Sequence, residues 1–154
     1  MEIIGILGAG AMGSGIAQVA ASRGHQVVVC DNLTPALKKS GKNLQAALAT
    51  LVDKGKMTNA ESDALLGKIQ YTDHMSDFRD CSVVIEAIVE DIELKRIAFK
   101  GVEAMVSDDT IIGSNTSSLS VSAIGAQLKH PERILGINLF NPAPMMRLVE
   151  IMTA

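Results

Sequence analysis

The chain alternates between short apolar runs typical of β-strands and longer stretches with helical periodicity. Apolar runs occupy residues 3–7 and 25–31, and between them, at 11–22, apolar residues recur with the spacing of one helical face. The second run is rich in β-branched residues, and the connection between the two runs is long enough for a crossover helix. The N-terminal segment therefore predicts a β-α-β unit with two parallel strands.

The same alternation continues along the rest of the chain. A long helix is predicted at 34–54, with Thr34 as its cap and Pro35 at its first helical position. Further helices are predicted near 59–68, 90–106 and 120–128, and further strands at 69–72, 81–88, 110–116, 133–140 and 148–154. This pattern predicts an α/β protein with a Rossmann-type, doubly wound, mostly parallel sheet and a long helical excursion after the second strand.

Composition and charge narrow the choice of partner. The 154 residues, 47% of them hydrophobic and 20% charged, suit one globular domain. A formal net charge of -3 gives no electrostatic reason to expect nucleic acid or a membrane surface, so we expect a small-molecule partner and no metal. Cys30 and Cys81 lie in apolar runs and are predicted to be buried, reduced thiols, which favours the cytoplasm. The N-terminus is typical of neither a signal peptide nor a spanning helix.

A glycine-rich turn follows the first predicted strand. Gly8, Gly10 and Gly13 form the pattern G-x-G-x-x-G at the start of the predicted helix. In a dinucleotide site, the first glycine permits the tight turn, the second lets the pyrophosphate approach the backbone, and the third lets helix and strand pack closely. Free N–H groups at the helix N-terminus would face the anion. The predicted phosphate-binding segment comprises Gly8, Ala9, Gly10, Ala11, Met12 and Gly13.

An acidic residue ends the second predicted strand. Asp31 follows the turn at about the distance, roughly 20 residues, at which a carboxylate binds the adenosine ribose hydroxyls and repels a 2′-phosphate. Asn32 stands where an NADP-binding protein more often has Arg, so we expect NAD as the cofactor. The alternative is that a glycine-rich turn and an acid at a strand end occur together by chance.

Four motifs resemble those of one enzyme family, the 3-hydroxyacyl-CoA dehydrogenases. In order along the chain they read GILGAGAMGSGIA, VVIEAIVED, SNTSSL and FNPAPMMRLVE. The resemblance covers nearly the whole chain and is to the NAD-binding domain of the family, including the long helical excursion. It implies reversible oxidation of 3-hydroxyacyl-CoA to 3-ketoacyl-CoA with hydride transfer to NAD, in fatty-acid or short-chain 3-hydroxybutyryl-CoA metabolism.

The resemblance also implies roles for individual residues. Ser117 matches the serine whose hydroxyl bonds the substrate oxygen, and Glu150 matches the glutamate that orients the catalytic imidazole. The alternative for Ser117 is that it only caps a turn. Met145 and Met146, beside the FNP sequence, are interpreted as packing residues.

Other matched residues concern the cofactor and the coenzyme A moiety. Glu90 and Lys95 match residues that meet the cofactor near the nicotinamide ribose, and Asn141 and Ser117 match further cofactor contacts. Glu90 and Lys95 have an alternative interpretation as ordinary charges on a solvated helix face. Lys54 matches a coenzyme A contact, although an exposed helix lysine needs no function.

The chain departs from the family at the catalytic base. The family reads G-[LI]-H-[FL]-F-N-P where this chain has Asn138 in place of the histidine, and the spacing to Glu150 is retained. An amide is a very poor base at neutral pH. His25, His74 and His130 are not convincing replacements. Three interpretations remain open: a naturally altered member, an engineered inactive variant, or an enzyme that relays a proton through water to Glu150.

The end of the sequence and the altered base leave rival functions. The terminal strand is not followed by a cap or turn, so we expect residues 1–154 to be a truncated NAD-binding domain. The helical C-terminal domain, through which family members form homodimers and close the acyl-CoA cleft, would then be absent. One rival is a non-enzymatic, crystallin-like family member that keeps the nucleotide site. Another is a β-hydroxyacid dehydrogenase, which has no FNPAP sequence.

Overall fold

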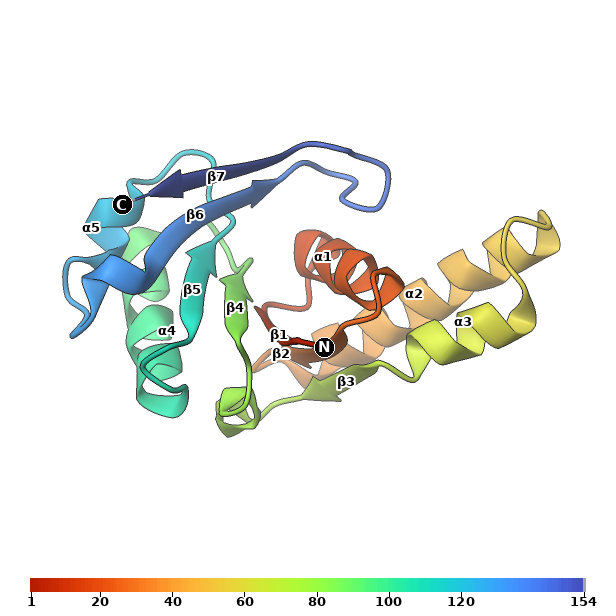
Figure 1. The fold of residues 1–154 in the computed structure, drawn as a ribbon, viewed down its shortest axis with the longest axis horizontal. Coiled ribbons are helices and arrows are strands. Elements are labelled where there is room, and N and C mark those ends of the chain that lie inside the picture. The colour runs from red at the N-terminus through yellow and green to blue at the C-terminus, as the bar shows by residue number, and fades with distance from the viewer. Residues whose placement is uncertain (154) are drawn as a thin grey trace.

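The computed structural model describes residues 1–153. Its strands form a single sheet with helices on both faces (Figure 1). The strand order is β3-β2-β1-β4-β5-β6-β7, in which β1 to β6 are parallel and β7 runs antiparallel to β6. This order confirms the predicted doubly wound sheet. The strands are β1 (Ile3–Leu7), β2 (Gln26–Cys30), β3 (Ile69–Thr72), β4 (Val83–Glu86), β5 (Ile111–Ser114), β6 (Ile134–Leu139) and β7 (Val149–Thr153).

The helices lie where the sequence predicts them, with differences at their ends. Leu33, not Thr34, occupies the N-cap of the long helix and gives it no side-chain cap, so the predicted threonine cap is wrong. Caps do occur on the two helices that follow, from Thr58 and Asp91. The helices are α1 (Ala11–Ser22), α2 (Thr34–Asp53), α3 (Asn59–Leu66), α4 (Ile92–Met105) and α5 (Val121–Gly125), with 3-10 turns at Met75–Phe78 and Pro131–Arg133.

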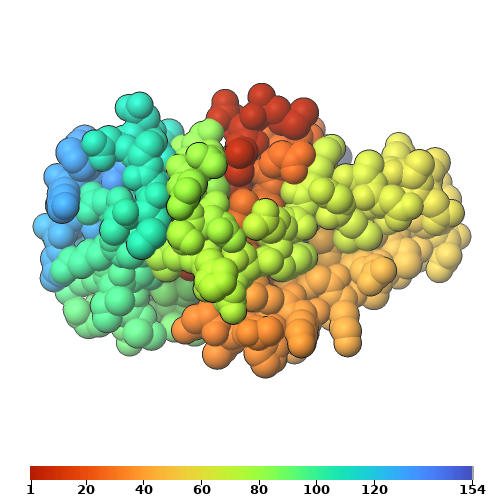
Figure 2. All heavy atoms as spheres, turned by 90° about the horizontal axis from the view of Figure 1, so that it is seen from below, coloured from red at the N-terminus to blue at the C-terminus, as the bar shows by residue number. Residues whose placement is uncertain are grey.

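Each face of the sheet has its own apolar core. One core packs α1, α2 and α3 against the sheet and contains Ile16, Leu44 and Leu48. The other packs α4 and α5 against the opposite face around Phe99 and Ile124. The far ends of α2 and α3 project beyond the body of the domain (Figures 1 and 2). These projecting ends are the helical excursion predicted after the second strand.

Several strands end earlier than the sequence predicts, and their ends define the site. β4 stops at Glu86 and β5 at Ser114, although the apolar runs predicted strands to 88 and 116. The residues that follow leave the sheet, and Ala87, Ile88, Asn115 and Ser117 among them line a pocket at its carboxyl edge. Ligands of open parallel sheets bind at this edge, where the strand order reverses between β1 and β4.

Candidate functional site

The glycine-rich turn is shaped by close backbone contacts. Gly8 has φ of 110°, and a Cβ atom there would lie 2.6 Å from the carbonyl oxygen of Ala87. At Gly13 a Cβ atom would lie 1.9 Å from the carbonyl oxygen of Gly8. Gly10 has φ of -71° and nothing within 4 Å of its Cβ position. Two of the glycines are therefore required by the fold, and the third leaves open space where a ligand would approach.

The start of α1 and the end of β2 form one polar surface beside this space. Gly10 is the N-cap of α1 and supplies no side-chain acceptor to the first-turn N–H groups. The Ala9 N–H donates to Asp31 Oδ2 over 2.8 Å, and the Leu33 N–H donates to Asp31 Oδ1 over 2.9 Å. The carboxylate is thus fixed against the turn with acceptor capacity left over. This arrangement fits a pyrophosphate at the helix and a ribose at the acid.

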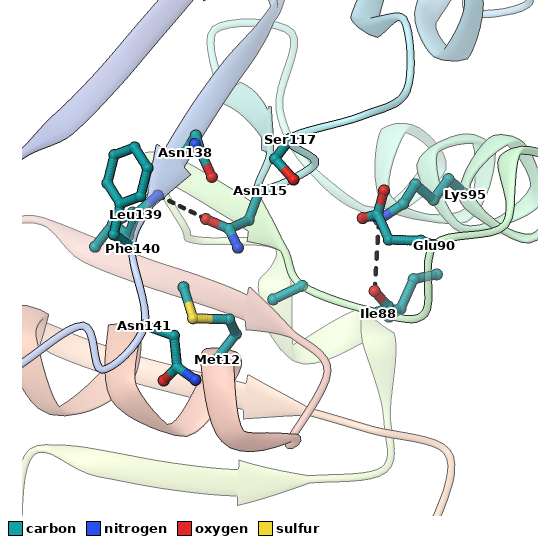
Figure 3. A pocket seen from close by; sticks show the side chains of 11 residues that line it. Met12, Ile88, Glu90, Lys95, Asn115, Ser117, Asn138, Leu139, Phe140 and Asn141 are labelled. Atoms are coloured by element: carbon teal, nitrogen blue, oxygen red, sulfur yellow. Dashed lines mark hydrogen bonds and ion pairs between the residues drawn. The ribbon is translucent and has the colours of Figure 1, made fainter.

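A pocket of about 400 Å³ lies at the carboxyl ends of β4, β5 and β6 (Figure 3). It brings together six residues that the sequence analysis assigned to the cofactor or to catalysis, from segments far apart in the chain. The residues of the pocket are Met12, Ala87, Ile88, Glu90, Lys95, Asn115, Ser117, Asn138, Leu139, Phe140 and Asn141.

Asn138 and Glu150 face each other across the hairpin of β6 and β7. They are partners in the strand register, and Asn138 Nδ2 donates to Glu150 Oε2 over 3.2 Å. A carboxylate only accepts hydrogen bonds, so the amide nitrogen must face it and the amide oxygen must point elsewhere. Asn138 is 6% exposed and lies beside Ser117 and Asn115 in the pocket (Figure 3). Asn138 and Glu150 thus form a hydrogen-bonded pair, with the Asn138 side chain in the wall of the pocket.

Asn115 is a pocket residue that the sequence analysis missed. Its side-chain oxygen accepts from the Leu139 N–H over 2.7 Å, which joins the ends of β5 and β6 and leaves the amide nitrogen beside the pocket. The turn that follows is capped by Thr116, whose hydroxyl accepts from the Leu119 N–H over 3.0 Å. The alternative role of Ser117 as turn cap is therefore wrong, and its exposed side chain lines the pocket.

A buried ionic network flanks the same pocket. Lys95 is 1% exposed, so its interpretation as a charge on a solvated face is wrong. Its Nζ atom lies 2.6 Å from Glu86 Oε1 and 3.2 Å from Glu90 Oε1. Burial raises the pKa of Glu90, but hydrogen bonds from Thr116 and Ser118 and the charge of Lys95 outweigh burial and hold the pKa below its ordinary value. Glu90 is therefore a carboxylate at neutral pH.

Some residues singled out from the sequence lie apart from the pocket. Lys54 directly follows the last residue of α2, is exposed and does not line the pocket. Met145 and Met146 are 79% and 47% exposed, so their interpretation as packing residues is wrong. The pocket contains none of the three histidines.

A second groove, of about 570 Å³, runs between α1 and α2. It extends from the glycine-rich turn to Pro142 and Pro144. Pro142 directly follows Asn141, which lines the first pocket. Ser40 is 3% exposed, and its hydroxyl lies 2.7 Å from that of Ser14. Ser40 was not assigned a role from the sequence, because a polar position on a long helix carries no motif.

The fold and the site together define a class of protein. A parallel sheet of this order, a glycine turn at the switch point and an acid that ends β2 are the features of a dinucleotide-binding dehydrogenase domain. Residues 3–154 match the family model described as "3-hydroxyacyl-CoA dehydrogenase, NAD binding domain", and the chain belongs to this family. Its cofactor is NAD.

Relatives of known name support this assignment. The chain is 39% identical to a 3-hydroxybutyryl-CoA dehydrogenase of Clostridioides difficile over 150 residues, which are 97% of this chain and 53% of the relative. A solved 3-hydroxybutyryl-CoA dehydrogenase of Escherichia coli K12 superposes with a TM-score of 0.95 at 37% identity, over 97% of this chain and 32% of that one. One from Ralstonia eutropha gives 0.94 at 36% identity, over 98% and 53%.

The chain spans about half the length of the first curated relatives it matches.

The described residues also bear on metal sites, membrane spans and cysteines. Among residues 1–153, no group of three or more His, Cys, Asp or Glu side chains is placed to hold a metal ion. In the same range, no helix combines the length and the apolar character needed to cross a bilayer. Both cysteines are free and buried, and burial raises the pKa of each thiol to about 11.

Proposed function

We propose that this chain binds NAD as part of a 3-hydroxyacyl-CoA dehydrogenase site whose proton-transfer step is impaired. The observation that carries the proposal is the hydrogen bond from Asn138 Nδ2 to Glu150 Oε2. The resemblance to the family assigns these two positions to the catalytic histidine and its glutamate partner. Binding of cofactor and substrate oxygen is retained in this proposal, and general-base catalysis is lost.

The chemistry of the amide explains the expected impairment. Oxidation of a 3-hydroxyl group requires a group that takes the hydroxyl proton, while bound NAD accepts the hydride. Asn138 is neutral and cannot take that proton at neutral pH. A positioned general base contributes about 10² to 10⁴-fold to the rate, so a loss of this size is expected.

The remaining polar groups of the pocket retain a binding role. The Ser117 hydroxyl and the Asn115 amide nitrogen are proposed to donate to the substrate oxygen. Asn138 Oδ1 can accept a hydrogen bond from a substrate hydroxyl, because the amide nitrogen is engaged by Glu150. Lys54 is proposed to meet the coenzyme A moiety from the end of α2, the helix that lines the second groove.

A non-enzymatic nucleotide-binding role is the second candidate. Asn138 favours it, because a protein without the reaction has no need of a base, and the turn and Asp31 would still hold the dinucleotide. The two candidates differ in what restoration of the histidine does. In an impaired enzyme it restores turnover, and in a protein that has lost the rest of the site it does not.

The test compares Asn138→His with the unaltered protein, both in the longest natural form because the curated relatives are about twice as long. NADH oxidation with acetoacetyl-CoA is measured at saturating NADH, and NADH affinity is measured in parallel. We expect the histidine variant to be about 10² to 10⁴-fold faster with unchanged NADH affinity. Equal and negligible rates, with NADH bound by both proteins, would favour the non-enzymatic candidate.

A further inference from the structure

The buried lysine of the pocket is surrounded by acceptors of the protein itself. Three oxygens of the chain lie within 3.5 Å of Lys95 Nζ, namely Glu86 Oε1, Glu90 Oε1 and the carbonyl oxygen of Ile88. An ammonium group has three donors, so the protein itself can use all of them. Lys95 therefore fixes the carboxylates of Glu86 and Glu90.

Glu86 is the fully buried member of the network and accepts from three donors of the protein. It is 0% exposed and accepts from Lys95 Nζ, from the Ser114 hydroxyl over 2.7 Å and from the Ile88 N–H over 2.7 Å. It does not line the pocket, since the chain turns into the pocket only at Ala87. Its charge is thus paired with Lys95 behind the pocket wall.

Glu90 is the member that reaches the pocket. Its side chain is 46% exposed, and its Oε2 atom accepts from the hydroxyls of Thr116 and Ser118 over 2.7 and 3.0 Å. Two carboxylates against one ammonium leave one negative formal charge. Glu86 is buried and paired with Lys95. The remaining negative charge is therefore assigned to the carboxylate of Glu90, which lines the pocket (Figure 3).

We propose that Glu86 and Lys95 are positioning residues that leave Glu90 as an uncompensated negative charge at the nicotinamide end of the cofactor site, and that this charge favours NAD⁺ over NADH. The inference rests on the proposed function and on the resemblance to the family, which implies that Glu90 lies near the nicotinamide ribose. The nicotinamide ring of NAD⁺ carries a positive charge and that of NADH carries none. Only the oxidised cofactor therefore gains attraction from Glu90.

The test measures dissociation constants of NAD⁺, NADH and ADP by calorimetry for the unaltered chain, Glu90→Gln and Glu93→Gln. Glutamine at 90 keeps an acceptor for Thr116 and Ser118 but removes the charge. Glu93→Gln is the matched control, because it removes the same charge three residues further along the chain, in the first turn of α4, at a side chain that pairs with Arg96 and does not line the pocket. ADP reports on the adenosine end alone.

We expect the ratio of the NAD⁺ to the NADH dissociation constant to rise about threefold to tenfold in Glu90→Gln, the size of one partly screened charge interaction. The shift should shrink at high salt. Glu93→Gln should leave the ratio unchanged, and ADP affinity should be the same in all three proteins. Glu86→Gln should shift the ratio in the same direction as Glu90→Gln, although residue 86 does not reach the pocket.

Two results would overturn the inference. If the unaltered chain binds both dinucleotides and the ratio is unchanged in Glu90→Gln, the charge assignment is wrong while the proposed cofactor site stands. If the unaltered chain binds neither dinucleotide, the proposed function and the inference fall together.

Discussion

The two ends of the cofactor site are built in different ways. At the adenosine end, the geometry depends on the backbone: Gly8 and Gly13 leave no room for a side chain, and backbone N–H groups hold Asp31. In the pocket that we propose for the nicotinamide end, the geometry depends on side chains that bond one another, such as Asn138 with Glu150. The comparison explains why the loss of the base that we propose would leave the site around it undisturbed.

The difference also separates binding from chemistry. A change in the glycine turn alters the space that the backbone itself must occupy, so fold and cofactor binding fail together. A change from histidine to asparagine keeps a polar, hydrogen-bonded side chain between the same partners, so only the proton acceptor is lost. The adenosine end should therefore be sensitive to size, and the nicotinamide end to chemical identity.

The largest expected effect comes from adding one methyl group to the turn. Gly13→Ala places a Cβ atom 1.9 Å from the Gly8 carbonyl oxygen, so the turn must open. We expect the free energy of unfolding in urea to fall by about 3 kcal/mol or more. Gly10→Ala is the matched control, because its Cβ would meet nothing within 4 Å, and replacing the N-cap glycine of α1 should cost only about 1 kcal/mol or less. Equal stability of the two variants would contradict the account.

Removing the charge at the end of β2 should weaken the cofactor and leave the fold intact. Asp31→Asn keeps the shape of the side chain but replaces a charged acceptor with a neutral one. We expect NADH affinity, measured by calorimetry, to fall by about 10 to 100-fold. Asp63→Asn, an exposed acid on α3, is the control and should bind as tightly as the unaltered chain. Unchanged affinity in Asp31→Asn would argue against a ribose at this acid.

A carboxylate remote from both ends should affect stability alone. Glu103 accepts from the N–H groups of Lys129 and His130 and pairs with Arg133. Burial raises its pKa, but these bonds outweigh burial and hold the pKa below its ordinary value of 4.5. Glu103→Gln should lower the free energy of unfolding by about 1 to 3 kcal/mol at pH 7.

The pH dependence of this difference follows from the sign of the shift. Because the pKa is lower in the folded state, the stabilisation by Glu103 is fully present above pH 4.5 and is lost as the pH falls through the lowered folded value. The stability gap between the two proteins in urea should therefore close in that acidic range. A gap that stays constant between pH 7 and pH ~3 would contradict this assignment.

The smallest expected effect concerns a cap on the projecting helices. The Thr58 hydroxyl accepts from the Glu61 N–H, and the Glu61 carboxylate accepts from the Thr58 N–H over 2.8 Å. Thr58→Ala should lower the free energy of unfolding by about 1 kcal/mol and leave NADH affinity unchanged. Urea denaturation measures the stability and calorimetry measures the NADH affinity. A loss of NADH affinity in this variant would contradict the account, because the cap lies on the projecting helices.

The sequence predicted the two ends of the site unequally. The fold, the glycine turn and Asp31 follow from local periodicity and spacing, and the structure contains them as predicted. The burial of Lys95 could not be predicted, because a lysine on a helix is normally exposed. Its partner Glu86 lies on a different element, the strand β4. Asn115 was missed for a similar reason, since its role depends on the neighbouring end of β6.

The end of the sheet shows a further limit. The pattern at 148–154 predicts a strand, but its direction and exposure depend on tertiary structure. All of β7 is exposed, including Ile151 at 68%, so an apolar run here does not mean a buried strand. Met145 and Met146 belong to the same exposed stretch, which explains why their interpretation as packing residues failed.

The most direct test of the account is calorimetry of the chain with NADH and with NADPH under the same conditions. Asp31, fixed by the Ala9 and Leu33 N–H groups, should accept the ribose hydroxyls and repel a 2′-phosphate. The account predicts one NADH site per chain and an affinity for NADPH that is about tenfold or more lower. No heat with NADH, or equal affinity for both, would contradict it.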